Sequence, residues 1–412
     1  MMKKILLFAF VLCLLCLIRC SDDSIKSKDL SGDDPHLTPA DLTDTDKGLI
    51  KADNTFGFKL FKEVVREDKD ENVFVSPLSV AMALGMTYNG AAGTTREQMQ
   101  QVLELKGMTV EEVNQAYRNV IDVLTNLDDQ VDFRIANSIW YRLGLPVEQT
   151  FLDLNQTYFD AEVTALDFTA PESPGIINGW VDEKTNGKIT EIVGPQIPGN
   201  VAMMLIDAIY FKGNWSDQFN PDSTQTAVFT LADDTQKECQ MMRKHTAFNY
   251  AWQPQFQIID LPYGDSAFSM TIIFPAEGVD IDAIIGEFNN DTWADWLGSL
   301  HKQEITLGLP KFKLEYEISL VDVLKILGMT EAFAPGADFS GMVKDHALWI
   351  DEVKHKTFVE VNEEGTEAAA VTVVIIVDSL PPWLEINRPF ILVIHDSETG
   401  TILFMGKIVD PT

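Results

Sequence analysis

The sequence has almost no cysteine outside its first twenty residues. Three of its four cysteines, Cys13, Cys16 and Cys20, lie at the N-terminus, so Cys239 stands alone in the rest of the chain. That part of the protein has no intramolecular disulfide available, and a single thiolate cannot form a cysteine-rich metal site. Because free cysteine is usually a buried residue, we expect Cys239 to pack in the core rather than to react.

Basic residues are also scarce. The chain has 31 lysines and arginines against 63 aspartates and glutamates, which gives a formal net charge of −32. A surface of this sign repels phosphate groups, so nucleic acid is excluded as an expected partner. The acidity is otherwise consistent with a solvated, soluble surface, and it identifies no target.

Motifs of common catalytic sites are missing. The chain has no HExxH, Walker loop, GxSxG elbow or CxxC, and its six histidines are scattered without the spacing of metal ligands. The glycine-rich stretch 90–95 lacks the lysine of a phosphate loop and reads as a connection between helices. We therefore expect no metal and no cofactor. A Ser-His-Asp site assembled in space stays open at this point.

The N-terminus has the pattern of a secretory signal. Lys3 and Lys4 precede the apolar run 5–18, which is too short for a comfortable membrane span. Residues 1–20 therefore predict export of the protein.

The end of this signal resembles a bacterial lipobox. Residues 17–20 read Leu-Ile-Arg-Cys, and in a lipobox the cysteine becomes the lipid-modified first residue of the mature chain. Arg19 departs from the small residue usual there, but residues 21–23 resemble the acidic stretch that follows the lipidated cysteine in surface lipoproteins of the Bacteroidota. We expect Cys20 to anchor the protein in a membrane, at the outer membrane or cell surface, with plain secretion as the alternative.

The rest of the chain divides into a tether and one domain. Residues 21–48 are rich in Ser, Asp, Gly and Pro and have no apolar period, which predicts a flexible tether. From residue 49 to residue 412 no linker interrupts a composition able to bury a large core.

Apolar periodicity places helices mostly early and strands mostly late in this domain. Residues 49–66 have helical spacing, and a strand over 72–76 leads into a helix through Met86 that is capped by Ser76 with Pro77 in its first turn. A further helix is expected after Gly93, where Thr95 and Gln98 have capping-box spacing. The other predicted elements are strands at 133–141, 201–211, 256–261, 268–274, 305–309, 357–361 and 390–394 and a helix at 319–327. The pattern indicates an α+β fold.

One segment near the C-terminus does not fit an ordinary strand. A run of small residues around Gly365 suggests a hinge, and it is followed by a strongly β-forming stretch over 373–377 that ends near Pro381 and Pro382. Composition alone leaves open a buried hairpin strand.

This segment resembles the hinge of inhibitory serpins, the serine protease inhibitor family. Residues 363–370 read Glu-Glu-Gly-Thr-Glu-Ala-Ala-Ala, at the distance from the C-terminus that is usual in the family. The resemblance extends over the whole domain from 49 to 412. Further blocks similar to those of the family are 72–79, 209–215, 309–312, 337–342, 387–390 and 403–411.

The resemblance implies a fold and a mechanism. We expect helices packed around three β-sheets with an exposed reactive-centre loop over about 363–382, in a monomer that is not an enzyme. A serpin is a suicide substrate: a protease cleaves the loop, stays attached as an acyl enzyme, and is carried across as the loop inserts into sheet A. The implied hinge residues are Glu363, Glu364, Gly365, Thr366, Glu367, Ala368, Ala369 and Ala370.

The resemblance also assigns residues that control sheet opening. Ser76, Ser79 and His355 would form the shutter region and Trp215 the breach where insertion begins, although each residue also suits packing or capping. Glu363 would pair with Lys311. Asp207 stands where the family usually carries Asn. If it faces His355, a charged pair would make opening sensitive to mildly acidic pH.

Alternation along an inserted strand sorts the side chains of the loop. Inserted residues would face the core from one phase: Thr366, Ala368, Ala370, Thr372, Val374 and Ile376. Glu367 lies on the opposite phase, where it stays in water. The fourteen residues from Thr366 to Ser379, at about 3.3 Å each, would move the acyl end by roughly 45 Å.

The reactive bond has three candidates. Counting from Gly365 gives Ser379-Leu380, counting back from Asn387 gives Asp378-Ser379, and an elastase would cut after Val377.

The chain has no Lys or Arg between Glu367 and Arg388, which argues against trypsin-like targets. Elastase-like or subtilisin-like serine proteases and papain-like cysteine proteases fit the apolar residues, whereas Asp378 leaves open an Asp-specific protease.

Two rival functions remain. A non-inhibitory serpin that serves as a binding protein usually carries bulky or charged hinge residues, and the alanines here argue against it. A surface hydrolase would turn over peptide or ester substrates, whereas an inhibitor is consumed one to one.

Overall fold

The computed structural model describes residues 36–344, 347–365 and 382–412. The predicted signal, Cys20 and most of the predicted tether therefore lie outside the described residues. So do the five later hinge residues from Thr366 to Ala370 and the three candidate reactive bonds. No helix within the described ranges is both long and apolar enough to cross a membrane.

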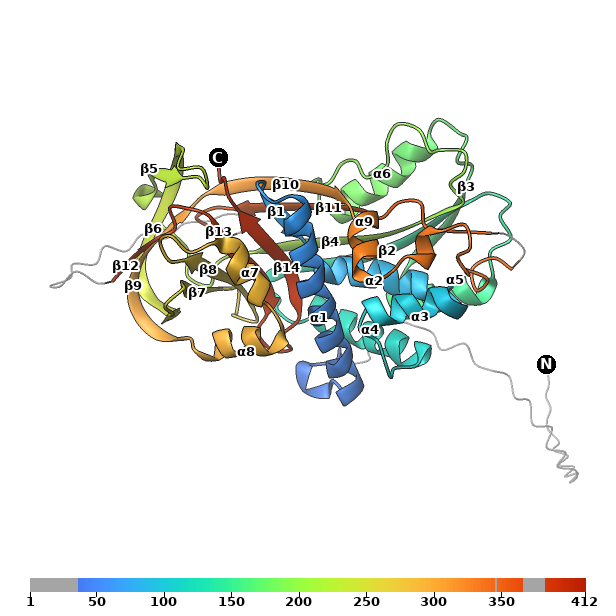
Figure 1. The fold of residues 1–412 in the computed structure, drawn as a ribbon, viewed down its shortest axis with the longest axis horizontal. Helices are drawn as coiled ribbons and strands as arrows, with labels where there is room; N and C mark the ends of the chain where they lie inside the picture. Colours follow the sequence, from blue (N-terminus) through green and yellow to red (C-terminus); the bar gives the residue numbers. More distant parts are fainter. Residues whose placement is uncertain (1–35, 345–346, 366–381) are drawn as a thin grey trace, which may run out of the picture. The chain divides into compact units, whose positions relative to one another are not determined.

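Most helices precede most strands of the largest sheet in the chain, as the periodicity predicted (Figure 1). The helices of the described residues are α1 (Asp44–Glu67), α2 (Pro77–Tyr88), α3 (Gly93–Val102), α4 (Val110–Thr125), α5 (Gln149–Phe159), α6 (Ser173–Lys184), α7 (Ile281–Glu287), α8 (Asn290–Gly298) and α9 (Val321–Leu327). Short 3-10 helices span Pro39–Asp41, Pro221–Ser223 and Glu331–Phe333.

The strands of the described residues form three sheets. The first has the order β3 (Glu162–Leu166), β2 (Val131–Arg142), β4 (Met203–Gly213), and the second pairs β10 (Phe312–Ser319) with β11 (Lys354–Val361). The third has the order β1-β14-β13-β8-β7-β6-β9-β12, with β5 paired to β6. Its strands are β1 (Val73–Val75), β5 (Gln225–Thr230), β6 (Gln236–Trp252), β7 (Phe256–Tyr263), β8 (Phe268–Pro275), β9 (His301–Pro310), β12 (Trp383–Glu385), β13 (Phe390–Asp396) and β14 (Ile402–Ile408).

The start of the domain was predicted too late. Helix α1 begins at Asp44 rather than at residue 49, because Thr43 forms a capping box with Asp46. The Thr43 side chain accepts from the Asp46 backbone N–H at 3.2 Å, and the Asp46 carboxylate accepts the Thr43 N–H at 2.8 Å. The last residues of the predicted tether, 44–48, are therefore part of the folded domain.

The two predicted helix caps differ in outcome. The Ser76 side chain accepts from the Ser79 N–H at the start of α2, with Pro77 in the first turn, as predicted. The Thr95 capping box is wrong: α3 starts at Gly93 without a side-chain cap. Thr95 instead accepts the N–H of Asp338, at 2.9 Å. A tertiary contact therefore takes the hydroxyl that the local pattern assigned to a cap.

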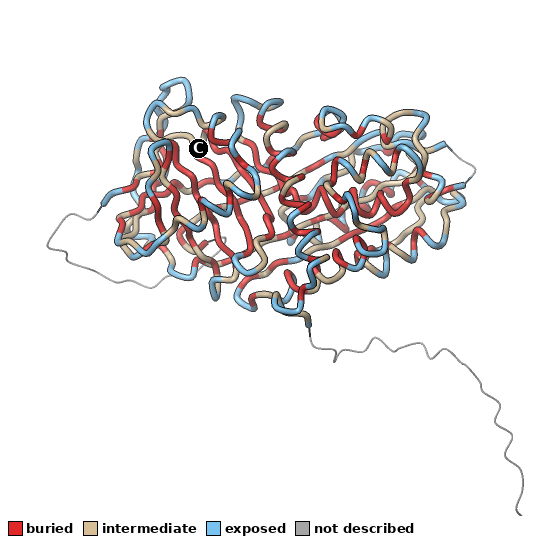
Figure 2. The backbone as a smooth tube through the Cα atoms, turned by 60° about the horizontal axis from the view of Figure 1, so that its bottom comes forward, coloured by how far each residue is buried: buried red, intermediate tan, exposed pale blue. Residues whose placement is uncertain are grey.

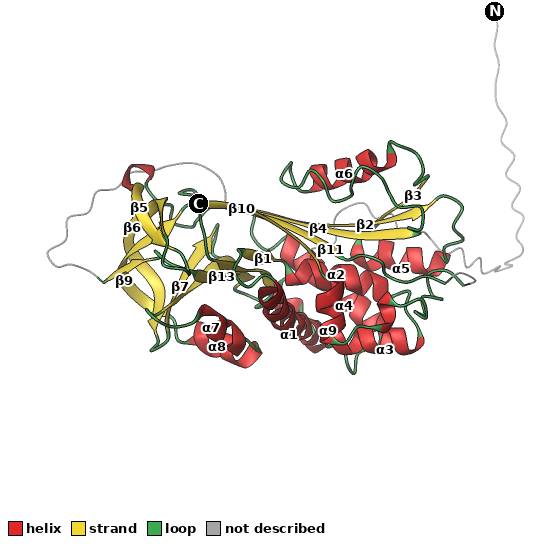
Figure 3. Cartoon of the chain, turned by 45° about the horizontal axis from the view of Figure 1, so that its top comes forward, coloured by secondary structure: helices red, strands yellow, loops and turns green. Residues whose placement is uncertain are grey.

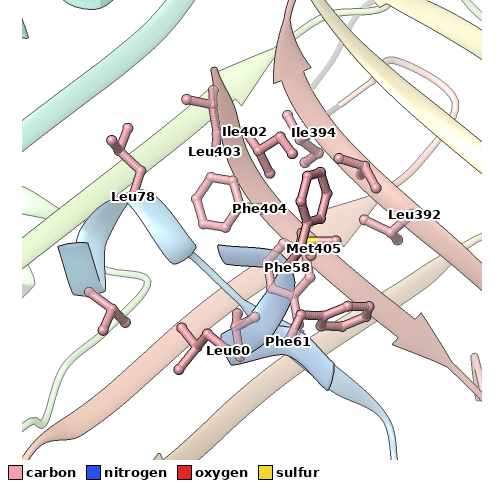
Figure 4. Packing of buried hydrophobic residues seen from close by; sticks show 14 of the residues in the cluster. Phe58, Leu60, Phe61, Leu78, Leu392, Ile394, Ile402, Leu403, Phe404 and Met405 are labelled. Carbon is pink, nitrogen blue, oxygen red and sulfur yellow. The ribbon is translucent and has the colours of Figure 1, made fainter. Parts of the chain in front are cut away.

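The main core lies between the third sheet and the early helices. Buried residues run through β13, β14 and α1 (Figure 2). Phe58 and Phe61 of α1 pack against Leu392 of β13 and Met405 of β14 in one apolar cluster (Figure 4). Cys239 is buried and free, as its isolation in the sequence predicted.

Helices cover both faces of the β3-β2-β4 sheet. Helix α6 lies on one face, and α2, α4 and α5 lie toward the other (Figure 3). The side chains of β4 alternate accordingly: Met203, Leu205, Ile209 and Phe211 pack toward the main core, while Met204, Ile206 and Ala208 pack in a smaller core beneath α6. Strand β4 therefore has an interior phase of odd-numbered residues.

Candidate functional site: a cleft between two sheet edges

Two neighbouring strands each have an edge without a partner strand. Strand β4 pairs with β2, and β11 pairs with β10, but no described strand pairs with the other edge of either. A cavity of about 550 Å³ lies there. Its lining includes residues 201–209, a stretch that begins just before β4, and residues 347–357, a stretch that begins before β11. We call this space the sheet cleft.

The two strands converge at Trp215, above the cleft. The Trp215 indole is buried and stacks on Tyr263, with ring centroids 4.4 Å apart. Its Nε1 donates to the carbonyl of Asn362 at 3.0 Å, and its backbone N–H donates to the carbonyl of Glu364 at 2.9 Å. Because the C-terminal ends of β4 and β11 meet here while their N-terminal halves line the cleft, the two strands run in the same direction.

Gly365 lies between these converging ends. It forms antiparallel bridges to Asn214 after β4 and to Asn362 after β11. Its φ of +124° favours glycine, and a Cβ built there would lie 2.4 Å from the carbonyl oxygen of Gly213. No other residue fits this position without movement of the backbone, so the close approach requires the glycine of the predicted hinge.

Glu363 holds the start of the hinge in place. Its carboxylate is 2.6 Å from the Lys311 Nζ, as the resemblance implied, and it accepts the Thr224 hydroxyl at 2.6 Å. Burial opposes ionisation of this carboxylate, but the hydrogen bonds from Lys311 and Thr224 outweigh burial and hold the pKa of Glu363 below its usual value. Residues 363–365 are therefore packed into the fold, and the exposed loop cannot begin before residue 366, which corrects the predicted start at 363.

Ser76 and His355 meet in the wall of the cleft. The Ser76 N–H donates to Nε2 of His355 at 2.9 Å, and its hydroxyl donates to the carbonyl of Leu403 at 2.7 Å. Burial lowers the pKa of His355 to about 4, so the ring is neutral at physiological pH with its proton on Nδ1. These contacts join α2, β11 and β14 at one point.

Asp207 faces the same cavity from β4. Both of its carboxylate oxygens are buried, and neither has a hydrogen-bond partner of good geometry. Burial raises the pKa of Asp207 to about 8 and outweighs the opposing effect of the nearby Ser79 side chain. The side chain is therefore a protonated, neutral acid at physiological pH.

The expected charged pair between Asp207 and His355 is wrong. The two residues line one cavity, but neither a hydrogen bond nor an ion pair joins them, and burial rather than a mutual charge shifts both pKa values. Both side chains are predominantly neutral between about pH 5 and pH 7. Mildly acidic pH therefore changes the charge of neither.

Two buried residues next to this region escaped the sequence reasoning. The Tyr117 hydroxyl on α4 donates to the Asp53 carboxylate on α1 at 3.0 Å, and burial raises the pKa of Asp53 to about 8. Asp53 occupies an interior position of the α1 period, between buried Ala52 and Asn54. A polar residue at a core-facing helical position was the available signal for it.

The three sheets, the early helices and the hinge at Gly365 define an α+β protein with a cleft between two parallel strand edges. A family model described as "Serpin (serine protease inhibitor)" matches residues 51–411. A similar protein is Serpin B6 of Pongo abelii, 36% identical over 88% of this chain and 99% of its own.

Solved structures agree with this assignment. The native state of Tengpin, a thermophilic serpin, aligns with a TM-score of 0.80 at 32% identity, over 88% of this chain and 94% of that one. Human thyroxine-binding globulin, in complex with its hormone, aligns with a TM-score of 0.82 at 27% identity, over 89% of this chain and all of that one.

The chain belongs to the serpin family. The predicted serpin fold is confirmed. Members of this family are in general protease inhibitors rather than enzymes, and thyroxine-binding globulin shows that the fold also serves to bind a small molecule.

Proposed function

We propose that this protein inhibits proteases irreversibly, as a suicide substrate whose cleaved loop inserts into the sheet cleft. The observation that carries the proposal is the pair of antiparallel bridges that Gly365 forms to Asn214 after β4 and to Asn362 after β11, because an inserted strand would continue this pairing. An added strand would complete the backbone hydrogen bonds of both open edges, which stabilises the inserted state.

The two bridges of Gly365 set the register of insertion. Each step forward along the loop is one step back along β4 from Asn214 and along β11 from Asn362. Thr366 would then lie between Gly213 and Val361. Seven residues beyond Gly365, both registers bring Thr372 between Asp207 and His355.

This register supports the expected alternation. Residues 366–376 would pair with the full length of β4, from Gly213 back to Met203. One phase of the inserted strand would face the interior, opposite the odd-numbered residues of β4. Its members are Thr366, Ala368, Ala370, Thr372, Val374 and Ile376. Glu367 would lie opposite Lys212 on the other phase, where opposite charges across strands are favourable.

The target class follows from the apolar loop residues. An elastase-like or subtilisin-like serine protease, or a papain-like cysteine protease, would accept Val377 beside the cut, at one of the three bonds between Val377 and Leu380. An Asp-specific protease that cuts after Asp378 is the alternative.

Incubation of the purified domain with neutrophil elastase tests the proposal. We expect an SDS-stable complex at a ratio near one to one, and intact-mass analysis of the released C-terminal peptide will identify the bond. Peptide and ester substrates should show no turnover by the protein itself. The proposal is wrong if elastase, subtilisin, papain and an Asp-specific protease all cleave the loop without a stable complex.

We also propose that the protein is exported and anchored in a bacterial outer membrane or cell surface through a lipid on Cys20. The support is the signal-like charge and apolar pattern of residues 3–18 and the acidic stretch after Cys20. In a lipoprotein-producing bacterium fed radiolabelled palmitate, we expect label in the wild type and none in Cys20→Ala. No label in either would favour plain secretion, and equal labelling of the two would show that lipid is attached at a residue other than Cys20.

A further inference from the structure

An exposed tryptophan stands where the described chain resumes after the loop. Trp383 is 57% exposed. Its backbone is nevertheless fixed, because β12 pairs with β9 and the Pro382 carbonyl accepts the Thr306 N–H at 2.9 Å. The next residue, Leu384, is buried. The ring is therefore a large apolar surface held on a rigid strand.

Two charged residues fix the orientation of this ring. Nε1 of Trp383 donates to the Glu385 carboxylate at 3.0 Å, and the Arg243 guanidinium carbon lies 5.7 Å from a Trp383 ring centroid. Arg243 Nη2 is 3.6 Å from the other Glu385 oxygen, and Nη1 donates to Gln225 at 3.0 Å. Nε of Arg243 is buried without a hydrogen-bond partner. We call Trp383, Glu385 and Arg243 the indole cluster.

Gly308 allows the cluster to close. It lies opposite Arg243 in the β6–β9 pair and opposite Glu385 in the β9–β12 pair. A Cβ at this position would lie 3.1 Å from Cγ of Glu385 and 3.4 Å from Met241. The missing side chain leaves the space in which the arginine and the glutamate approach each other across β9.

The cluster has the chemistry of an interface rather than of a core. Tryptophan and arginine are the residues most enriched at the energetic centres of protein interfaces. A side chain already held by neighbours loses little conformational entropy when a partner covers it. Intramolecular packing leaves Trp383 more than half exposed.

Position along the chain identifies the partner. The three candidate bonds follow Val377, Asp378 and Ser379, and Trp383 lies four to six residues beyond these positions. At about 3.3 Å per extended residue, that is a reach of roughly 13–20 Å. A protease that holds one of these bonds in its active site has its leaving-group side within this distance of the ring.

We propose that the indole cluster is a docking surface for the target protease, in contact with an apolar patch beside the subsites that hold the leaving-group side of the loop. The proposal rests on the proposed inhibitory function. It adds a determinant of target choice outside the reactive loop, acting on the initial encounter and not on strand insertion.

The test uses Trp383→Ala with Trp252→Ala as the matched control. Trp252 is also exposed, at 64%, and it stands nine residues from Arg243 at the far end of β6. The protease is elastase, or the first protease that gives a stable complex if elastase only cleaves. Non-covalent affinity is measured with a form of that protease whose catalytic serine or cysteine is alanine.

We expect Trp383→Ala to weaken this non-covalent complex and to slow the second-order inhibition rate by about tenfold. The stoichiometry of inhibition and the thermal midpoint should stay at the wild-type values. Trp383→Phe keeps an apolar ring but loses the bond to Glu385, so it should show a smaller loss.

Three outcomes overturn the docking surface. If wild type traps the protease and Trp383→Ala has the same affinity and inhibition rate, the docking surface is wrong and the proposed inhibitory function stands. An equal loss in Trp252→Ala would show that any exposed ring gives the effect. Failure of wild type to trap any protease would remove the proposed function and the docking surface together.

Discussion

Under the proposed insertion mechanism, replacing Thr372 with aspartate is expected to convert the protein from an inhibitor into a substrate. The register set by the two bridges of Gly365 would bring residue 372 between Asp207 and His355 during insertion. Asp207 is already a buried acid without a hydrogen-bond partner, so a second carboxyl beside it would have to be desolvated in the same cavity. Such burial costs several kcal/mol, and insertion would stall about halfway along the strand.

A stalled loop gives the acyl enzyme time to hydrolyse. For Thr372→Asp we expect the SDS-stable complex to disappear and the stoichiometry of inhibition to rise from near one to more than about ten. Titration of protease activity against inhibitor concentration, with gels of the products, measures both quantities.

Two control variants separate this effect from general damage to the loop. Thr372→Ser keeps a hydroxyl between Asp207 and His355 and should inhibit like wild type. Glu367→Gln changes charge on the opposite phase and should also retain the complex. Normal complex formation by Thr372→Asp would contradict the register, or would mean that insertion does not extend to Asp207.

The sequence predicted the fold well where a strong local pattern decides the structure. The Ser76 cap, the helix after Pro77 and the late strands follow from side-chain chemistry and alternation, and the structure contains them. The start of α1 was missed because Thr43 and Asp46 lie in a polar stretch without an apolar period, where only the capping box marks the helix. Thr95 was misassigned because a distant backbone N–H, that of Asp338, uses its hydroxyl.

The resemblance brought three residues of the sheet cleft together but did not predict their protonation. The sequence brought Ser76, Asp207 and His355 to one region by resemblance, and the structure places all three around one cavity. Their spacing contains no information on burial, however, and burial decides the charge of Asp207 and His355. The sheet cleft itself also depends on strand pairing between distant segments, which no local pattern specifies.

The last prediction concerns the contribution of Asp207 to stability. Burial raises the folded-state pKa of this acid to about 8, far above its unfolded value, so the folded protein keeps a proton that the unfolded chain releases. This acid therefore does not reduce the free energy of unfolding below about pH 4. As the pH rises from about 4 to 8, the free energy of unfolding falls. A shift of this size corresponds to at most about 6 kcal/mol, and relaxation around the charge would reduce it to about 3 kcal/mol.

Asp207→Asn removes the ionisable group and should raise the free energy of unfolding by about 3 kcal/mol at pH 8.5 and by much less at pH 4.5. Urea unfolding at the two pH values measures the difference, and Asp295→Asn, an exposed aspartate on α8, is the control. Part of the pH dependence should survive in Asp207→Asn, because burial raises the pKa of Asp53 in the same direction. A gain of equal size at pH 4.5 and pH 8.5 would show that the amide stabilises the cleft by new hydrogen bonds rather than by removing a buried acid.

Inhibition rates of wild type and Asp207→Asn should likewise have the same pH profile between pH 5 and pH 7, because Asp207 and His355 both stay neutral there.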